Sequence, residues 1–159
     1  MATIHIIHGY IAFGKTTLAK KLAQELPAVH LDADDVMRQL YGKDLPESEF
    51  AAKVPLVINF MWDMARKIIN AGADVIMDVG PWSRQMRQDA LNIAQQITPN
   101  VIFHTIILDT KIARERLIKR NQENQILDVT TTEFFDKYLS LYEPISDDEG
   151  LIVKRYYQE

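Results

Sequence analysis

Short apolar segments alternate with longer amphipathic segments along the whole chain. The apolar segments have the length and composition of β-strands and cover residues 3–8, 28–31, 74–79, 101–109 and 151–156. Between them, apolar positions recur with helical spacing in residues 15–25, 35–40, 47–70, 83–96, 111–121 and 133–142. Strands that alternate with helices are typical of a parallel sheet with crossover helices. The pattern therefore predicts an α/β fold.

Several of the predicted helix ends carry residues that commonly cap helices. Ser83 and Thr110 stand at the starts of helical segments, where hydroxyl side chains accept hydrogen bonds from free backbone N–H groups. Thr130 with Glu133 three residues later matches a capping box. Gly72 follows the longest helical segment, where glycine often ends a helix. These residues fix the expected helix boundaries.

Composition narrows the class of protein. The length of 159 residues is common for one domain with its own core, so we expect a single domain over residues 1–159. The absence of cysteine excludes disulfides, thiolate catalysis and cysteine-ligated metal centres. No basic leader and no window near the ~20 apolar residues of a membrane span is present, so we expect a cytoplasmic protein that does not bind membranes. A net charge of −4 makes extended nucleic-acid binding unlikely, although a nucleic-acid end could still be a substrate.

A phosphate-binding motif follows the first predicted strand. Residues 9–16 read GYIAFGKT, which fits G-x-x-x-x-G-K-[ST], and an amphipathic helix follows directly. In such a loop, backbone N–H groups and the helix N-terminus surround the phosphates, the lysine contacts the β- and γ-phosphates, and the hydroxyl holds Mg²⁺. The motif predicts a site for ATP and Mg²⁺. The loop residues expected to contact the nucleotide are Gly9, Ala12, Phe13, Gly14, Lys15, Thr16 and Thr17.

Phe13 is unusual within this loop, because the residue before the Gly-Lys pair is usually small. A phenylalanine there must either find an apolar pocket behind the loop or distort the loop. We expect the Phe13 side chain to pack away from the phosphates and to leave nucleotide binding intact.

Acidic residues end the second and third predicted strands, in LDADDVMR (31–38) and VIMDVG (75–80). Ligands collect at the carboxyl ends of strands in such sheets. Asp34 or Asp35 could orient an acceptor hydroxyl as general base, and Asp78 could organise Mg²⁺. Helix capping and turn formation are the alternative roles for these carboxylates. Arg38 could contact an anionic part of the acceptor or could simply be solvated.

A basic segment precedes a polar one near residues 111–132. Arg116 and Arg120 lie four residues apart and so share one helix face, at the start of a possible lid over the triphosphate (about residues 115–132). A solvated basic helix is the alternative. Trp82 follows Asp78 at the same sheet edge and could stack on a substrate ring, although packing is the more common role.

These segments, in their order, resemble the kinase-like P-loop family that includes polynucleotide kinase, chloramphenicol phosphotransferase and the zeta toxins. The resemblance rests on GYIAFGKTT, LDADDVMR, VIMDVGPWSRQMR, ARERLIKRN and YEPISDDEG. It implies a five-stranded parallel sheet of order 2-3-1-4-5 with helices on both faces, a small helical lid, and transfer of the γ-phosphate of ATP to a hydroxyl.

The resemblance also implies roles for individual residues. It makes Asp34 the general base, Arg38 an acceptor-phosphate contact, Arg120 a catalytic lid residue over the triphosphate, and Arg87 a basic substrate-binding position after the third strand. Polynucleotide kinase has a second lid arginine four residues beyond the first, where this chain has Asn124. Arg116, one turn earlier, is a candidate replacement.

The sequence thus favours an ATP-dependent phosphotransferase that acts on a hydroxyl of a small molecule, a nucleotide or a nucleic-acid end. A nucleotide-binding regulatory module with little or no catalysis is the alternative, and a nucleotide hydrolase is a weaker third reading. No guanine signature N-K-x-D is present, so adenine is favoured by default.

Overall fold

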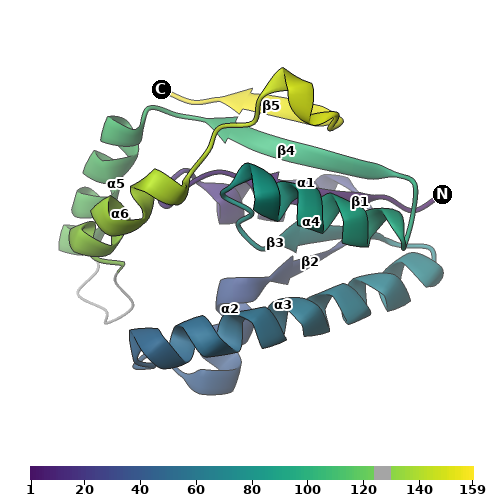
Figure 1. Cartoon of the computed structure of the whole chain (residues 1–159), viewed down its shortest axis with the longest axis horizontal. Helices are drawn as coiled ribbons and strands as arrows, with labels where there is room; N and C mark the ends of the chain where they lie inside the picture. Colours follow the sequence, from purple (N-terminus) through teal and green to yellow (C-terminus); the bar gives the residue numbers. More distant parts are fainter. Residues whose placement is uncertain (124–129) are drawn as a thin grey trace.

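The structure, a computed structural model, describes residues 1–123 and 130–159. Its centre is a five-stranded parallel sheet in the order β2-β3-β1-β4-β5 (Figure 1). The resemblance implied this strand order, and the structure confirms it. The strands are β1 (Ile4–His8), β2 (Ala28–Asp32), β3 (Asp74–Asp78), β4 (Val101–Ile107) and β5 (Val153–Tyr157).

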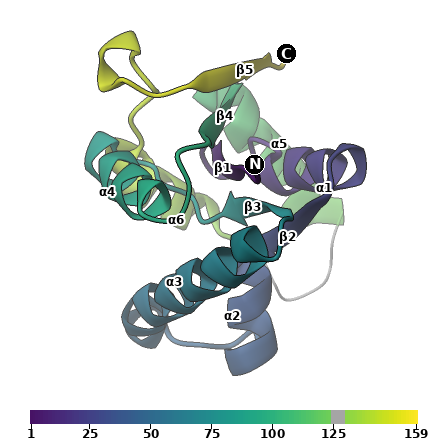
Figure 2. The same ribbon diagram turned by 90° about the vertical axis from the view of Figure 1, so that its right-hand side faces the viewer.

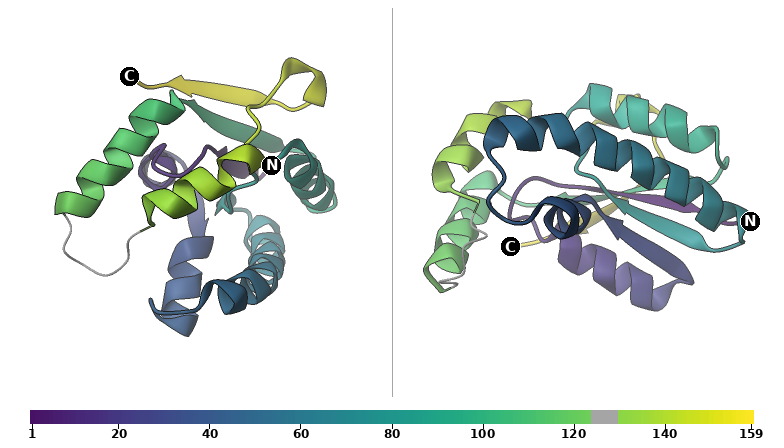
Figure 3. Two further views of the ribbon diagram at one scale, coloured as in Figure 1. Left: turned by 60° about the vertical axis from the view of Figure 1, so that its left-hand side comes forward. Right: turned by 90° about the horizontal axis from the view of Figure 1, so that it is seen from below.

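Helices cover both faces of the sheet and one of its ends. Helix α1 (Lys15–Glu25) packs on one face, while α3 (Glu47–Asn70) and α4 (Arg84–Gln95) pack on the other (Figure 2). Helix α2 (Ala33–Tyr41) continues directly from β2 and contacts α3. Helices α5 (Thr110–Glu123) and α6 (Thr132–Tyr138) lie side by side beyond the carboxyl ends of the strands (Figure 3).

The central strand β1, Ile-His-Ile-Ile-His, is buried on both faces, as its largely apolar sequence predicts. Ile4 and Ile6 pack in the core formed with α2, α3 and α4, whereas Ile7 packs with Ile76 against α1. All four side chains are fully buried. Because β1 and β3 are neighbours and parallel, the loop after β1 and the carboxylate of Asp78 at the end of β3 meet at one edge of the sheet.

The capping predictions have mixed outcomes. The Ser83 hydroxyl accepts a hydrogen bond from the Met86 N–H as expected, and Gly72 adopts φ 88° just after α3. The capping box at Thr130 is wrong, because Thr131 caps α6 by accepting from the Phe134 N–H. Thr110 is the first residue of α5 rather than its cap, since the Asp109 carboxylate accepts from the Lys111 N–H.

Most strand and helix boundaries lie one or two residues from those expected; β4, for example, ends at Ile107 and not at residue 109. The last helical segment ends as an α-helix at Tyr138 and continues as a short 3-10 helix, Leu139–Leu141. Helix α2 begins at Ala33, two residues earlier than expected, because the Asp32 carboxylate accepts from the N–H groups of Asp34 and Asp35. The earlier start places both of these carboxylates in the first turn of a helix. No helix in the described residues is both long and apolar enough to cross a membrane.

Candidate active site

The loop between β1 and α1 has the backbone conformation of a phosphate-binding loop. Gly14 caps α1 with φ 89°, and Ala12 adopts φ 62°, so two residues of the loop are left-handed. A left-handed conformation is easy for glycine and strained for alanine. A Cβ on Gly9 would lie only 3.3 Å from the Cβ of Phe13, so the loop is also closely folded upon itself. The N–H groups at the start of α1 therefore face the centre of the loop.

Lys15 lies where the loop meets the acidic strand ends. Its Nζ donates a hydrogen bond to the carbonyl of Tyr10 at 3.0 Å. Burial lowers the pKa of the Lys15 ammonium, while the nearby charges of Asp78 and Asp34 oppose that shift. The ammonium thus lies between these carboxylates and the loop, in the place where it can contact phosphate oxygens.

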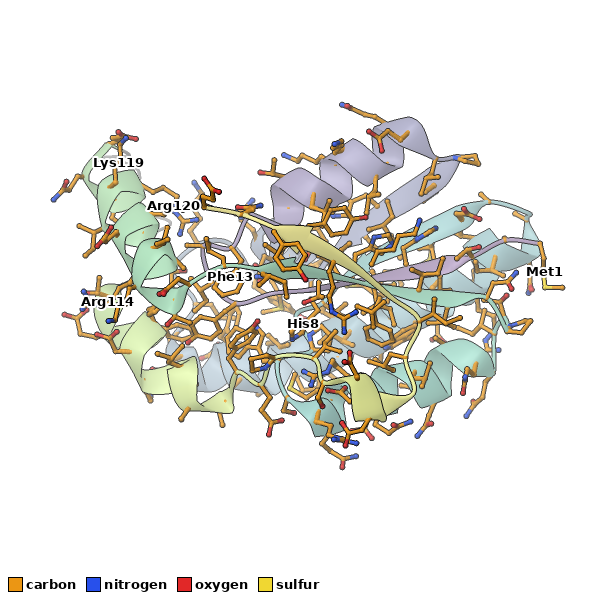
Figure 4. The ribbon with its side chains drawn as sticks, turned by 90° about the horizontal axis from the view of Figure 1, so that it is seen from above. Met1, His8, Phe13, Arg114, Lys119 and Arg120 are labelled. Atoms are coloured by element: carbon orange, nitrogen blue, oxygen red, sulfur yellow. The ribbon has the colours of Figure 1, made fainter. Side chains whose placement is uncertain are left out.

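Phe13 packs behind the loop, as expected. Its side chain is 1% exposed and makes edge contacts with Tyr10 and with Tyr142, whose ring centroid is 5.4 Å away. Figure 4 shows Phe13 on the inner side of α5, near the carboxyl ends of the strands. The bulky residue therefore fills an apolar space on the side of the loop away from the cavity described below.

Thr16 and Asp78 lie together at the position expected for a metal ion. The Thr16 hydroxyl donates to Asp78 Oδ2 at 3.3 Å, and Asp32 is the direct neighbour of Asp78 in the β2–β3 register. Hydroxyl and carboxylate oxygens are the ligands that Mg²⁺ prefers. The residues present therefore fit a Mg²⁺ ion that accompanies a bound nucleotide.

A cavity of about 890 Å³ opens beside the loop and has the size of a small-molecule site. It is bounded by α1, the end of β2, α2, the end of α5 and Thr130. Its lining includes Thr16, Lys20, His30, Asp32, Asp34, Asp35, Arg38, Arg120 and Thr130. Several of the predicted site residues are thus brought together around one open space.

Asp34 and Asp35 both line this cavity, but their surroundings differ. The Asp35 carboxylate accepts hydrogen bonds from Gln39 at 2.7 Å and from Arg38 at 3.4 Å along the surface of α2. Asp34 lies close enough to Lys15 for their charges to interact. Desolvation within the concave site, followed by the charge of Asp32, raises the pKa of Asp34. Asp34 is therefore the carboxylate nearer to the loop chemistry.

The two lid arginines occupy different places. Arg120 lines the cavity, and its charge lowers the pKa of Lys15, so it lies on the phosphate side (Figure 4). Arg116 instead donates to the Gln158 side chain at 2.7 Å and to the Glu159 carbonyl at 2.8 Å. Gln158 in turn lies beside Gly14 of the loop. Asn124, where the family has a second arginine, lies outside the described residues.

The structure does not bring Arg87 and Trp82 to the cavity lining. Arg87 is fully buried and makes a two-pronged ion pair with Glu149, at 2.8 and 2.6 Å. Trp82 packs against Tyr10, with ring centroids 4.9 Å apart. Both side chains support the region behind the loop, so we assign them structural roles in place of the substrate contacts expected from the sequence.

Sequence reasoning did not assign His30 to the site, although His30 lines the cavity. Its Nε2 lies 3.5 Å from Asp78 Oδ2. A signal was available, because His30 precedes Asp32 by two residues on one strand and therefore points to the same face of the sheet. The strand pairing that sets Asp78 beside Asp32 was needed to see that the three side chains meet.

Comparison with known proteins places this site within a family. The family model described as "AAA domain" matches residues 4–145, which is most of the chain. The chain belongs to this family. The AAA domain match covers the phosphate-binding loop, both acidic strand ends and the lid.

Relatives of this AAA domain chain include kinases. The shikimate kinase of Thermodesulfovibrio yellowstonii is 26% identical over 156 residues, which cover 92% of this chain and 86% of that protein. A chain in the Pnkp1/Rnl/Hen1 RNA repair complex superposes with a TM-score of 0.71 at 17% identity, over 88% of this chain and 43% of that chain. A sugar kinase from Janibacter sp. HTCC2649 gives a TM-score of 0.63 at 16% identity, over 98% and 86% of the two chains. The structural likenesses show the fold, and the family match with its kinase relatives identifies a P-loop kinase.

Proposed function

We propose that this protein transfers the γ-phosphate of ATP to a hydroxyl of a small molecule, a nucleotide or a nucleic-acid end. One observation carries the proposal: Thr16, which ends the phosphate-binding motif and donates to Asp78, lines the same open cavity as the Asp34 carboxylate. A nucleotide site alone would not require an acid-lined space next to the γ-phosphate position.

Each group has a role that follows from its place. The loop N–H groups and Lys15 bind the phosphates, and Arg120, on the phosphate side of the lid, neutralises charge that develops on the transferred group. Asp34 accepts the proton of the acceptor hydroxyl. Its raised pKa brings the carboxylate closer to the pH at which proton transfer is efficient.

Thr16 and Asp78 are the residues that would hold Mg²⁺ in this scheme, with Asp32 beside them. When bound with the nucleotide, Mg²⁺ neutralises phosphate charge and fixes the phosphate geometry. The hydrogen bond between Thr16 and Asp78 holds these two groups next to each other.

The cavity suggests an acceptor with an anionic group. Arg38 and Lys20 belong to its lining, on the α2 and α1 sides respectively, and either cation can pair with a carboxylate or phosphate. Shikimate, sugar acids, nucleotides and 5′-hydroxyl oligonucleotides therefore form the acceptor panel. The names of the relatives justify the inclusion of shikimate and of an RNA end.

The test measures phosphoryl transfer from ATP with Mg²⁺ to each member of this panel, using Asp34→Asn and Asp35→Asn as a matched pair. We expect Asp34→Asn to lower kcat by about 10²- to 10⁴-fold, the usual contribution of general-base catalysis, and to retain ATP binding. Asp35→Asn, which removes the same charge from the neighbouring residue, should have a much smaller effect.

Two results would count against the proposal. Equal losses in both variants would remove Asp34 from the role of base. Tight ATP binding without transfer to any acceptor, together with a partner protein retained only when nucleotide is present, would favour a regulatory module instead.

A further inference from the structure

Three side chains with metal-binding chemistry meet at the ends of β2 and β3. They are His30, Asp32 and Asp78, and one ligand atom from each lies within 4.8 Å of the others. Their meeting follows from the sheet, because His30 and Asp32 alternate on one strand and Asp32 pairs with Asp78 on the next. An imidazole thus joins two carboxylates at the wall of the cavity.

His30 Nε2 has no hydrogen-bond partner, although the atom is buried. The side chain as a whole is 15% exposed, and Nε2 points toward Asp78 Oδ2 at 3.5 Å. A buried polar atom without a partner is costly and calls for an explanation. The Lys15 ammonium lies near Asp32 and Asp78, but it does not supply a partner for His30 Nε2. A metal ion bound between the three side chains would accept the lone pair of His30 Nε2 and would further reduce the repulsion between the two carboxylates.

The nitrogen ligand determines which ion fits. Mg²⁺ favours oxygen ligands, whereas imidazole with carboxylates suits first-row transition ions. A tetrahedral ion about 2.1 Å from each ligand holds the ligand atoms about 3.4 Å from one another. His30 Nε2 and Asp78 Oδ2, which are 3.5 Å apart, already have this spacing. Rotation of the Asp32 side chain would bring its carboxylate to the same ion. Since His30 and Asp32 line the cavity, the remaining coordination positions face open space.

We propose that His30, Asp32 and Asp78 form a site for a divalent transition ion of the Zn²⁺ or Co²⁺ type that fills without nucleotide. The site shares Asp78 with the Mg²⁺ position proposed above, but it goes beyond the kinase activity and does not depend on it. Asp78 Oδ2 lies 3.3 Å from the Thr16 hydroxyl and 3.5 Å from His30 Nε2, between the two positions.

The test uses tag-free full-length protein without nucleotide. Co²⁺ and Mg²⁺ are titrated separately by calorimetry, and the visible absorption of Co²⁺ reports its ligands. We expect one Co²⁺ per chain, bound more tightly than Mg²⁺. His30→Gln should weaken Co²⁺ binding by at least about tenfold and change the Co²⁺ spectrum, since even outer ligand partners are worth 10- to 100-fold.

Two further variants distinguish loss of a metal ligand from a general effect of charge or folding. Asp63→Asn removes an exposed carboxylate on α3 and should leave Co²⁺ affinity unchanged. Asp32→Asn should weaken Co²⁺ binding as His30→Gln does. This second variant provides an independent result if His30→Gln folds poorly. Thermal unfolding of each variant shows whether it is folded. Unchanged Co²⁺ affinity and spectrum in His30→Gln, or Co²⁺ binding no tighter than Mg²⁺, would overturn the proposal. Because ATP is absent, a failed kinase assay would leave these results unaffected.

Discussion

The buried ion pair between Arg87 and Glu149 gives a sharp prediction about stability. Arg87 is fully buried, and the Glu149 side chain is 3% exposed. The guanidinium also donates to the carbonyl oxygens of Trp82 at 2.9 Å and Glu143 at 2.8 Å. It thereby joins α4 to the chain segment 143–149 that leads into β5. A single side chain satisfies several buried acceptors from three parts of the sequence.

Removal of Arg87 should be much more costly than loss of an ordinary surface ion pair. Arg87→Met keeps most of the apolar volume but leaves Glu149 and the carbonyl oxygens without their donor. Breaking one partner of a buried pair typically costs 3–5 kcal/mol. We expect about 3 kcal/mol, the lower end, because the adjacent Asp148 is exposed and water can approach Glu149. That is a large part of a typical total stability of 5–15 kcal/mol.

Urea denaturation of four proteins measures this effect: wild type, Arg87→Met, Glu149→Gln and the double variant. The double variant should lose less than the sum of the single losses, because the two side chains stabilise each other. Arg84→Met is the matched control, since Arg84 pairs with Asp148 at the surface. Its loss should be much smaller than that of Arg87→Met, because a surface ion pair is screened by water.

The pH dependence of the stability provides a second test of the Arg87–Glu149 ion pair. The hydrogen bond from Arg87 holds the pKa of Glu149 below its ordinary value of 4.5. A depressed pKa in the folded state means that the carboxylate stabilises the fold above pH 4.5 and that this contribution is lost as the pH falls through the folded value. The difference between wild type and Arg87→Met should therefore shrink in acid. A loss below 1 kcal/mol, or strictly additive single losses, would refute the reasoning.

Three further predictions concern the loop and its surroundings. Phe13→Ala should destabilise the fold by about 3–5 kcal/mol in urea denaturation, as for other buried phenylalanines, and leave ATP affinity in a nucleotide titration unchanged. If nucleotide bound only after Phe13→Ser, our account of Phe13 would be wrong. Lys15→Met should abolish measurable phosphoryl transfer and weaken ATP binding without a loss of thermal stability, because burial already disfavours the ammonium in the absence of phosphate. His8 should stay neutral from pH 8 to pH 5 in NMR titration, since burial and then Arg87 lower its pKa to about 3. Its stabilising contribution should therefore decline as the pH falls below 6.5, and a resonance that titrates near 6.5 would contradict this.

Much of the fold could be predicted because its signals are local. The strand before the loop has isoleucine at three of its five positions, and the helix after it has an apolar face. The positions of β1 and α1 follow from residues 3–25 alone. The phosphate-binding loop was predictable for the same reason, since its motif and its flanking elements are contiguous in sequence.

The rest of the site could not be predicted in the same way, because its residues are far apart in the sequence and meet only in the folded structure. Arg87 stands 62 residues from Glu149, and nothing in the local sequence distinguishes a buried arginine from a substrate contact. His30 illustrates the same limit, because its neighbour Asp78 comes from another strand and only the register unites them. The residues alone left Asp34 and Asp35 as alternatives, and the family resemblance favoured Asp34. The structure adds a physical difference between them, since the Asp35 carboxylate accepts a hydrogen bond from Gln39.

The packing behind the loop explains why the unusual Phe13 is compatible with a phosphate-binding site. Tyr10 and Phe13 both belong to one buried aromatic cluster on the side of the loop away from the cavity. The Tyr10 hydroxyl donates to the Phe135 carbonyl at 2.7 Å and so ties the loop to α6. Substitutions behind the loop should therefore change stability, whereas substitutions of Lys15 or Asp34 on its cavity side should change turnover. If the first group of variants changes only stability and the second changes only turnover, the aromatic residues support the loop and the residues near the cavity carry out the reaction.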